Sequence, residues 1–98
     1  MEEQHKRAPL TEEQQKEKIV RSFFQNGRLA SIPVKAGKRE VILGYVADKY
    51  FVKERTYTEQ EVNAILLQIY NDPFTLRREL IEAGLMARKS DGSAYWKN

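Results

Sequence analysis

Three side chains near the carboxyl end have the types and the spacing needed to bind phosphate. The dipeptide Asp91-Gly92 is typical of a two-residue hairpin turn, which would place Arg88 directly opposite Tyr95. Arg88, Tyr95 and Lys97 would then share the outward face of the hairpin. A tyrosine between two cations can lie along a DNA backbone, because the cations contact phosphates. A cross-strand cation–π contact on a solvated face explains the same spacing equally well. The same register pairs Met86 with Lys97 and Ala87 with Trp96, and it assigns Leu85, Ala87 and Trp96 to the inward face.

The segment before this hairpin, residues 73–83, predicts a helix whose outer face could enter a DNA groove. On a helical wheel the outward half carries Thr75, Arg78, Glu79 and Glu82. Arg78 is the better candidate for a DNA contact, although the two glutamates on this face repel phosphate. Arg77 falls within the apolar half, which favours a packed stem with a carboxylate partner over a DNA contact.

A second basic surface is predicted before these elements. Residues 18–51 carry seven cations against two anions, whereas the formal net charge of the whole chain is only +3. Within this segment, Lys38 and Arg39 follow a loop that contains Lys35, and both are candidates for DNA contacts. A flexible basic loop that serves solubility is the competing interpretation.

The sequence offers few groups for catalysis or for binding a metal. Its only histidine is His5, and it contains no cysteine. A histidine-based triad and an imidazole or thiolate metal site therefore cannot be assembled. The glycines also lack the spacing of a phosphate-binding loop. We expect a protein that is not an enzyme and that has no metal, cofactor or small-molecule ligand.

Capping signals and apolar periodicity predict the elements that would position the candidate residues. We expect helices over residues 11–24, 38–51, 58–70 and 73–83 and a hairpin over residues 85–97. The second helix is ambiguous, because Val41, Ile42 and Val46 would also suit a strand. Gly27 is expected to end the first helix in a left-handed conformation.

This order of elements predicts an α+β fold, a winged helix-turn-helix-like domain with an extra N-terminal helix. Residues 1–10 are expected to form a flexible tail and residues 11–98 a single domain. That domain would consist of an N-terminal extension, 11–37, and a winged-helix core, 38–98. No apolar run is long enough to span a membrane and no signal peptide opens the chain, so we expect a cytoplasmic location.

Four apolar side chains exceed what a winged-helix core requires: Phe23, Phe24, Tyr45 and Leu67. If the first helix folds back, it covers them within one chain. If it does not, they form an exposed patch that must bind a protein partner or a second copy. The chain is therefore expected to be either a DNA-binding domain or an interaction and dimerisation module that does not itself bind DNA.

Three segments taken together resemble a bacterial family of domains of unknown function. They are SFFQNGRLASIPVKAGKREVIL, YTEQEVNAIL and DPFTLRRELIEAGLMARKSDGSAYW, and the resemblance spans about residues 22–96. Such domains occur alone or fused to DNA-binding modules in proteins regarded as transcriptional regulators. The resemblance thus implies a regulatory role and transfers no catalytic residue. The sequence departs from the family at Tyr70, where relatives often carry histidine, so a role for that side chain is in doubt.

Overall fold

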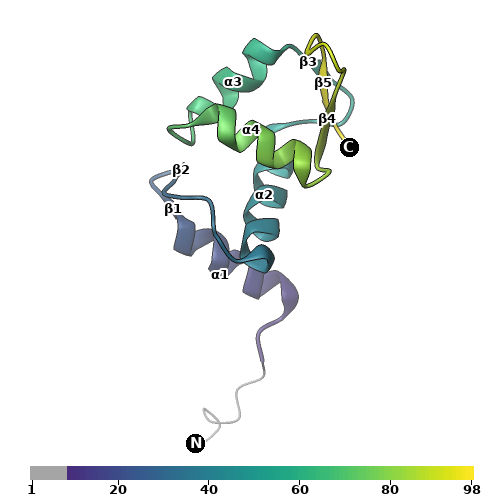
Figure 1. The fold of residues 1–98 in the computed structure, drawn as a ribbon. Coiled ribbons are helices and arrows are strands. Elements are labelled where there is room, and N and C mark those ends of the chain that lie inside the picture. Colours follow the sequence, from purple (N-terminus) through teal and green to yellow (C-terminus); the bar gives the residue numbers. More distant parts are fainter. Residues whose placement is uncertain (1–8) are drawn as a thin grey trace, which may run out of the picture.

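Four helices and two small antiparallel sheets make up the α+β fold of this chain, as a computed structural model that describes residues 9–98 shows (Figure 1). The predicted flexible tail, residues 1–10, lies almost wholly outside the described residues. Within the described part of the chain, no helix is both long enough and apolar enough to cross a membrane. The elements in chain order are α1 (Glu12–Phe23), β1 (Phe24–Gln25), β2 (Arg28–Leu29), α2 (Ala36–Tyr50), β3 (Thr56–Tyr57), α3 (Glu59–Leu67), α4 (Pro73–Glu82), β4 (Met86–Arg88) and β5 (Tyr95–Lys97).

The predicted starts of the first and third helices are confirmed by their capping contacts, whereas α2 begins at Ala36, two residues before its predicted start, and has no side-chain cap. Thr11 and Gln14 form a capping box at α1, and Thr58 and Glu61 form one at α3. Both boxes satisfy backbone N–H groups that have no partner inside the helix. The predicted third helix was too long, because α3 ends at Leu67 and the chain then turns toward α4.

The segment that also suited a strand is the helix α2. Four of its residues, Ile42, Leu43, Val46 and Ala47, are at most 1% exposed and lie at the centre of the core. The core continues into α3 and α4 through Val62, Leu66, Leu76 and Leu80, which are fully buried. Because α2 touches α1 on one side and α4 on the other, it needs apolar side chains around most of its circumference.

Gly27 does have positive φ, but its predicted place at the end of the first helix was wrong. The helix α1 ends at Phe23. The strands β1 and β2 then form a hairpin with a two-residue turn, in which Phe24 pairs with Leu29. Asn26 and Gly27, the turn residues, both have positive φ, 54° and 78°. This is the geometry of a type I′ turn, which favours Asn-Gly. Residues 24–29 therefore form a hairpin, and the Asn26-Gly27 signal for it was overlooked in the sequence.

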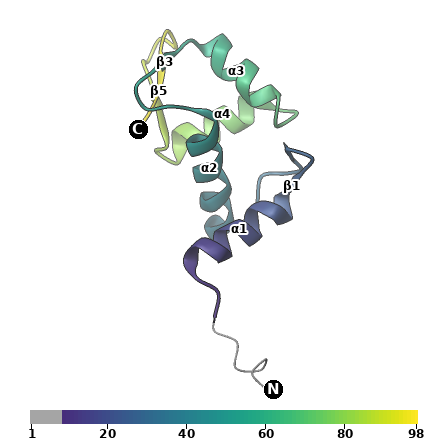
Figure 2. The same ribbon diagram turned by 180° about the vertical axis from the view of Figure 1, so that it is seen from behind.

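This hairpin fastens the N-terminal extension to the turn between α3 and α4 (Figures 1 and 2). The Arg28 guanidinium donates to the carbonyls of Leu67 (3.4 Å) and Gln68 (2.9 Å) and to Asn71 Oδ1 (2.8 Å). The Leu29 N–H donates to the Ile69 carbonyl at 2.7 Å. Carbonyls at the end of a helix have no partner inside it and form the negative end of the helix dipole. A cation there satisfies these carbonyls and interacts favourably with the dipole. Sequence reasoning overlooked this role of Arg28.

Replacing Arg28 with methionine should lower the free energy of unfolding by about 1–2 kcal/mol, because the charged hydrogen bonds to the α3–α4 turn are lost. Equilibrium unfolding in urea measures this change. Arg21→Met, on the exposed side of α1, is the matched control and should change stability by less than about 0.5 kcal/mol. Equal stability of the Arg28 and Arg21 variants would contradict the proposed role of this clamp.

The second sheet contains a strand that was not predicted. Its order is β3-β5-β4, and Tyr57 of β3 pairs with Tyr95 of β5. Tyr57 is 3% exposed and its ring meets Phe51 edge to face at 5.1 Å. Its hydroxyl accepts from the Val52 N–H at 2.9 Å, which satisfies both groups. The strand β3 therefore joins the end of α2 to the hairpin at the far end of the sequence.

Candidate nucleic-acid interface

The helix α4 is fixed at both ends by local contacts. The Asp72 carboxylate accepts from the Thr75 N–H (3.1 Å) and the Thr75 hydroxyl (2.6 Å), and these hydrogen bonds hold the Asp72 pKa below its usual value. At the other end, Gly84 has a φ of 77° and the Leu85 N–H donates to the Leu80 carbonyl. This closing pattern is the Schellman motif. Thr75, a candidate for a DNA contact, is thus engaged by the cap.

The outward side of α4 is a row of residues spaced by four. Phe74 is 59% exposed, and Arg78 and Glu82 follow it on the same side. Glu79 is only half-exposed, and its carboxylate lies 4.0 Å from the Arg39 Nε. Arg39 also donates to the Val34 carbonyl at 2.7 Å, so its predicted availability for DNA is reduced. The outward face of α4, whose two glutamates were expected to repel phosphate, is therefore less acidic than its composition suggests.

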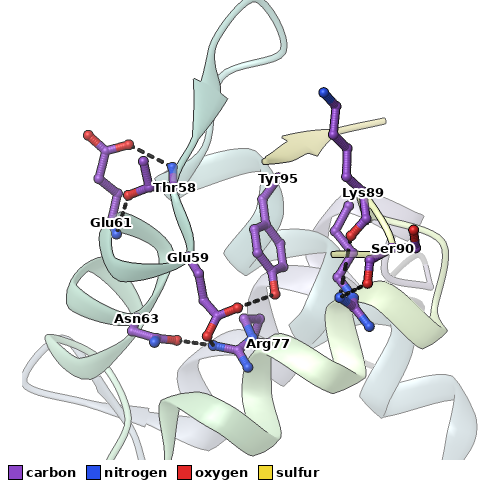
Figure 3. A network of polar contacts seen from close by, with 9 residues as sticks. Thr58, Glu59, Glu61, Asn63, Arg77, Lys89, Ser90 and Tyr95 are labelled. Atoms are coloured by element: carbon purple, nitrogen blue, oxygen red, sulfur yellow. Dashed lines mark hydrogen bonds and ion pairs between the residues drawn. The ribbon is translucent and has the colours of Figure 1, made fainter. Parts of the chain in front are cut away.

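Arg77 joins α3, α4 and the second sheet through a polar cluster (Figure 3). Its guanidinium donates to Asn63 Oδ1 and lies 3.7 Å from Glu59 Oε2, and its side chain is only 19% exposed. The same group lies over the Phe74 and Tyr95 rings, 5.6 Å from each centroid. The structure thus gives Arg77 the packed, carboxylate-paired position that the helical wheel favoured.

The predicted pairing of β4 with β5 is confirmed, but the predicted faces are reversed. Arg88 pairs with Tyr95, Ala87 with Trp96 and Met86 with Lys97. Met86 and Tyr95, however, are 1% and 2% exposed, whereas Ala87 and Trp96 are half-exposed. Tyr95 faces the core because its pairing partner on β3 is the buried Tyr57. A strand pattern defines two faces, and only the third strand decides which of them is covered.

Tyr95 and Lys97 are therefore not on the outward face. The Tyr95 hydroxyl donates to Glu59 Oε1 at 3.2 Å, and burial of the ring raises the Tyr95 pKa. The Lys97 ammonium lies 3.0 Å from Asp48 Oδ1 of α2, and the lysine side chain is 18% exposed. Both residues hold the sheet against the helices, and the expectation that they contact a DNA backbone loses its structural basis.

The turn of this hairpin also differs from the predicted two-residue turn. The Lys89 N–H donates to the Ala94 carbonyl at 2.9 Å, so four residues, 90–93, form the loop. Asp91 Oδ1 accepts from the Ser93 N–H at 2.9 Å, and of the loop residues only Gly92 has positive φ, 76°. A Cβ on Gly92 would lie 3.1 Å from Glu59 Oε1, so the loop tip rests against the start of α3.

The cations that remain available lie on α4, on the β4–β5 hairpin and at the start of α2. Arg78 and Arg88 are exposed as predicted, and Lys89, which follows Arg88 in the sequence and is also exposed, was overlooked. The Arg88 guanidinium makes only long contacts, 3.4 Å each, with the carbonyls of Lys89 and Ser90. Lys38 is exposed at the start of α2. Among the described residues, none of these four side chains forms an ion pair.

Three of the four predicted interaction residues are covered within the chain. Phe23 and Phe24 pack against the core, and the Phe24 ring meets Tyr45 edge to face at 5.2 Å. The helix α1 therefore folds back on α2, as one of the two alternatives predicted. Leu67 is the exception, because it is 54% exposed. Phe74, in the first turn of α4, is exposed as well.

The described residues contain no group of three or more histidine, aspartate or glutamate side chains placed to hold a metal ion. The polar clusters in this part of the chain pair carboxylates with arginines or with helix N-termini. What these residues offer chemically is a set of charged and aromatic surfaces.

The chain belongs to a bacterial family of unknown function. Residues 28–97 match the family described as "Uncharacterized protein conserved in bacteria (DUF2087)". The match begins at Arg28, the clamp residue, and continues through β5, so it excludes α1 and β1. Neither the curated proteins nor the solved structures gave a match to this chain.

Proposed function

We propose that residues 36–97 form a winged helix-turn-helix domain that binds DNA. In this proposal α4 is the recognition helix and the β4–β5 hairpin is the wing. The element order supports it, because a helix and an edge strand precede two helices joined by a short turn, and a hairpin follows whose last strand pairs with that edge strand. The resemblance to domains fused to DNA-binding modules agrees with a cytoplasmic, non-catalytic regulator of transcription.

The observation that carries the DNA-binding proposal is the distribution of cations that form no ion pair within residues 9–98. Arg78 on α4 and Arg88 and Lys89 on the wing are exposed, on the two elements that a winged helix directs at a duplex. The carboxylates beside them are partly neutralised, since Glu59 faces Arg77 and Glu79 faces Arg39. Phosphate contacts supply much of the affinity for DNA, so free cations at these places favour binding.

Titration of a labelled generic duplex at low and moderate salt tests the proposal. Arg78→Ala and Lys89→Ala should each weaken binding and reduce the slope of log affinity against log salt by about one unit, as expected for one lost phosphate contact. Glu82→Gln should strengthen binding, because it removes an exposed charge that phosphate repels. Lys18→Ala on α1, far from this face, is the matched control and should leave the slope unchanged.

Two results would overturn the DNA-binding proposal. One is the absence of any binding by the wild-type protein at low salt. The other is an equal loss of affinity in Arg78→Ala, Lys89→Ala and Lys18→Ala, because this would reflect net charge and not a defined interface.

The second candidate is a protein-interaction module, and one observation favours it. Leu67 lies one turn after Asn63 on α3, and Phe74 lies one turn before Arg77 on α4. Asn63 and Arg77 are hydrogen-bonded, so the two exposed apolar side chains lie on the same side of this helix pair. Loss of partner binding in Leu67→Ser/Phe74→Ser, with DNA binding absent from the wild type, would support this candidate.

A further inference from the structure

An open groove runs between α1 and α2, and one end of it adjoins Asp48, which forms an ion pair with Lys97 of β5. It has a volume of about 870 Å³. Its floor is apolar and includes Val20, Val41 and Tyr45, each half-buried. Gly44 also lines it, and a Cβ built there would meet nothing within 4 Å. An apolar seam with a small residue at its centre admits another helix at close distance.

The first half of helix α1 has little support from its own chain. None of its twelve residues is buried, and those from Glu12 to Lys18 are all exposed. Its contacts with the core are made by Ile19, Val20 and Phe23, in its second half. Helices of this length are marginal in water unless tertiary packing supports them. The first half of α1 therefore has an unpartnered face.

The charges along the groove wall of α1 are self-complementary. Glu13, Glu17 and Arg21 line the groove at intervals of four residues, which places them on one side of the helix. The amino end of this row is acidic and its carboxyl end is basic. If two such helices pack antiparallel about a two-fold axis at Glu17, Glu13 of each copy faces Arg21 of the other, because both lie four residues from the axis.

We propose that the groove is the dimer interface of this protein and that its occupant is α1 of a second copy. The apolar floor supplies the buried seam, Gly44 allows close approach, and the two Glu13–Arg21 contacts fix the antiparallel direction. Antiparallel helices also oppose their dipoles favourably. Near the axis the two Glu17 carboxylates repel each other, and Lys16, on the same wall, partly compensates for this repulsion.

Charge reversal tests the dimer by sedimentation equilibrium over a concentration series. Arg21→Glu should raise the dimer Kd at least about tenfold, since it places like charges together at two positions. Glu13→Arg should do the same, and the double variant Glu13→Arg/Arg21→Glu should restore association. Glu17→Gln should tighten the dimer. Lys18→Glu, on the same helix outside the groove, is the matched control and should leave the Kd unchanged.

A mixing experiment separates a failed interface from a failed helix. Equal amounts of Arg21→Glu and Glu13→Arg chains, each monomeric alone, should form a heterodimer, because both contacts between positions 13 and 21 are again between opposite charges. Circular dichroism of each variant checks that α1 is retained. Three results would each overturn the proposal: a wild type that stays monomeric throughout the series, a dimer insensitive to both reversals, or folded variants that fail to associate on mixing.

Discussion

Tyr95→Ala is expected to lower the free energy of unfolding by about 3–5 kcal/mol, the cost of removing a buried aromatic side chain. The Tyr95 side chain is 2% exposed and its pairing partner Tyr57 is buried beside it. The substitution leaves a cavity under the central strand of the sheet. It also leaves Glu59 without the hydroxyl that donates to it. Equilibrium unfolding in urea or guanidinium measures the loss.

Two variants resolve the contributions to this loss. Tyr95→Phe keeps the ring and removes only the hydrogen bond to Glu59, so it should cost about 0.5–1.5 kcal/mol. Arg88→Ala removes the exposed cross-strand neighbour of Tyr95 and should cost less than about 0.5 kcal/mol. If Tyr95 were on the outward face, all three substitutions would have small effects on stability. A Tyr95→Ala protein as stable as Arg88→Ala would contradict the buried position.

Arg77→Ala is expected to lower the free energy of unfolding by about 2–3 kcal/mol, because its hydrogen-bonding and charged partners are left partly buried. The Arg77 guanidinium contacts Asn63 and Glu59 and lies over two aromatic rings. Arg77→Lys should recover only part of the loss, since an ammonium lacks the planar fork that contacts both partners. Arg78→Ala is the matched control, because the adjacent arginine is exposed and forms no ion pair among the described residues.

A double-mutant cycle with Glu59→Gln isolates the Arg77–Glu59 contact. The coupling energy should be about 0.5–1.5 kcal/mol, above that of an exposed pair, because Arg77 is mostly covered. Near-zero coupling, together with a stable Arg77→Ala protein that has lost DNA affinity, would show that Arg77 belongs to the binding surface and not to the packing.

The sequence by itself determined the helices and the partners along the last hairpin. Capping boxes at Thr11 and Thr58 and the Asp72-Pro73 start are local signals, since each involves contacts within one turn. The pairing of Arg88 with Tyr95 followed from period-two alternation about the turn. The position of Arg77 between apolar neighbours on the helical wheel also indicated its packed role. These features depend on residues close together in the chain.

Only the tertiary structure decided which faces are buried and which charges remain free. Tyr95 is buried because its strand β5 pairs with β3. Tyr95 and its partner Tyr57 are 38 positions apart in the sequence, so no local pattern reveals that pairing. The Arg28 clamp, the Asp48–Lys97 ion pair and the Glu79–Arg39 contact likewise join distant segments. The availability of a surface arginine depends on which carboxylate the fold brings beside it. The sequence specifies how many charges the chain carries, and long-range packing determines which of them remain available to a partner.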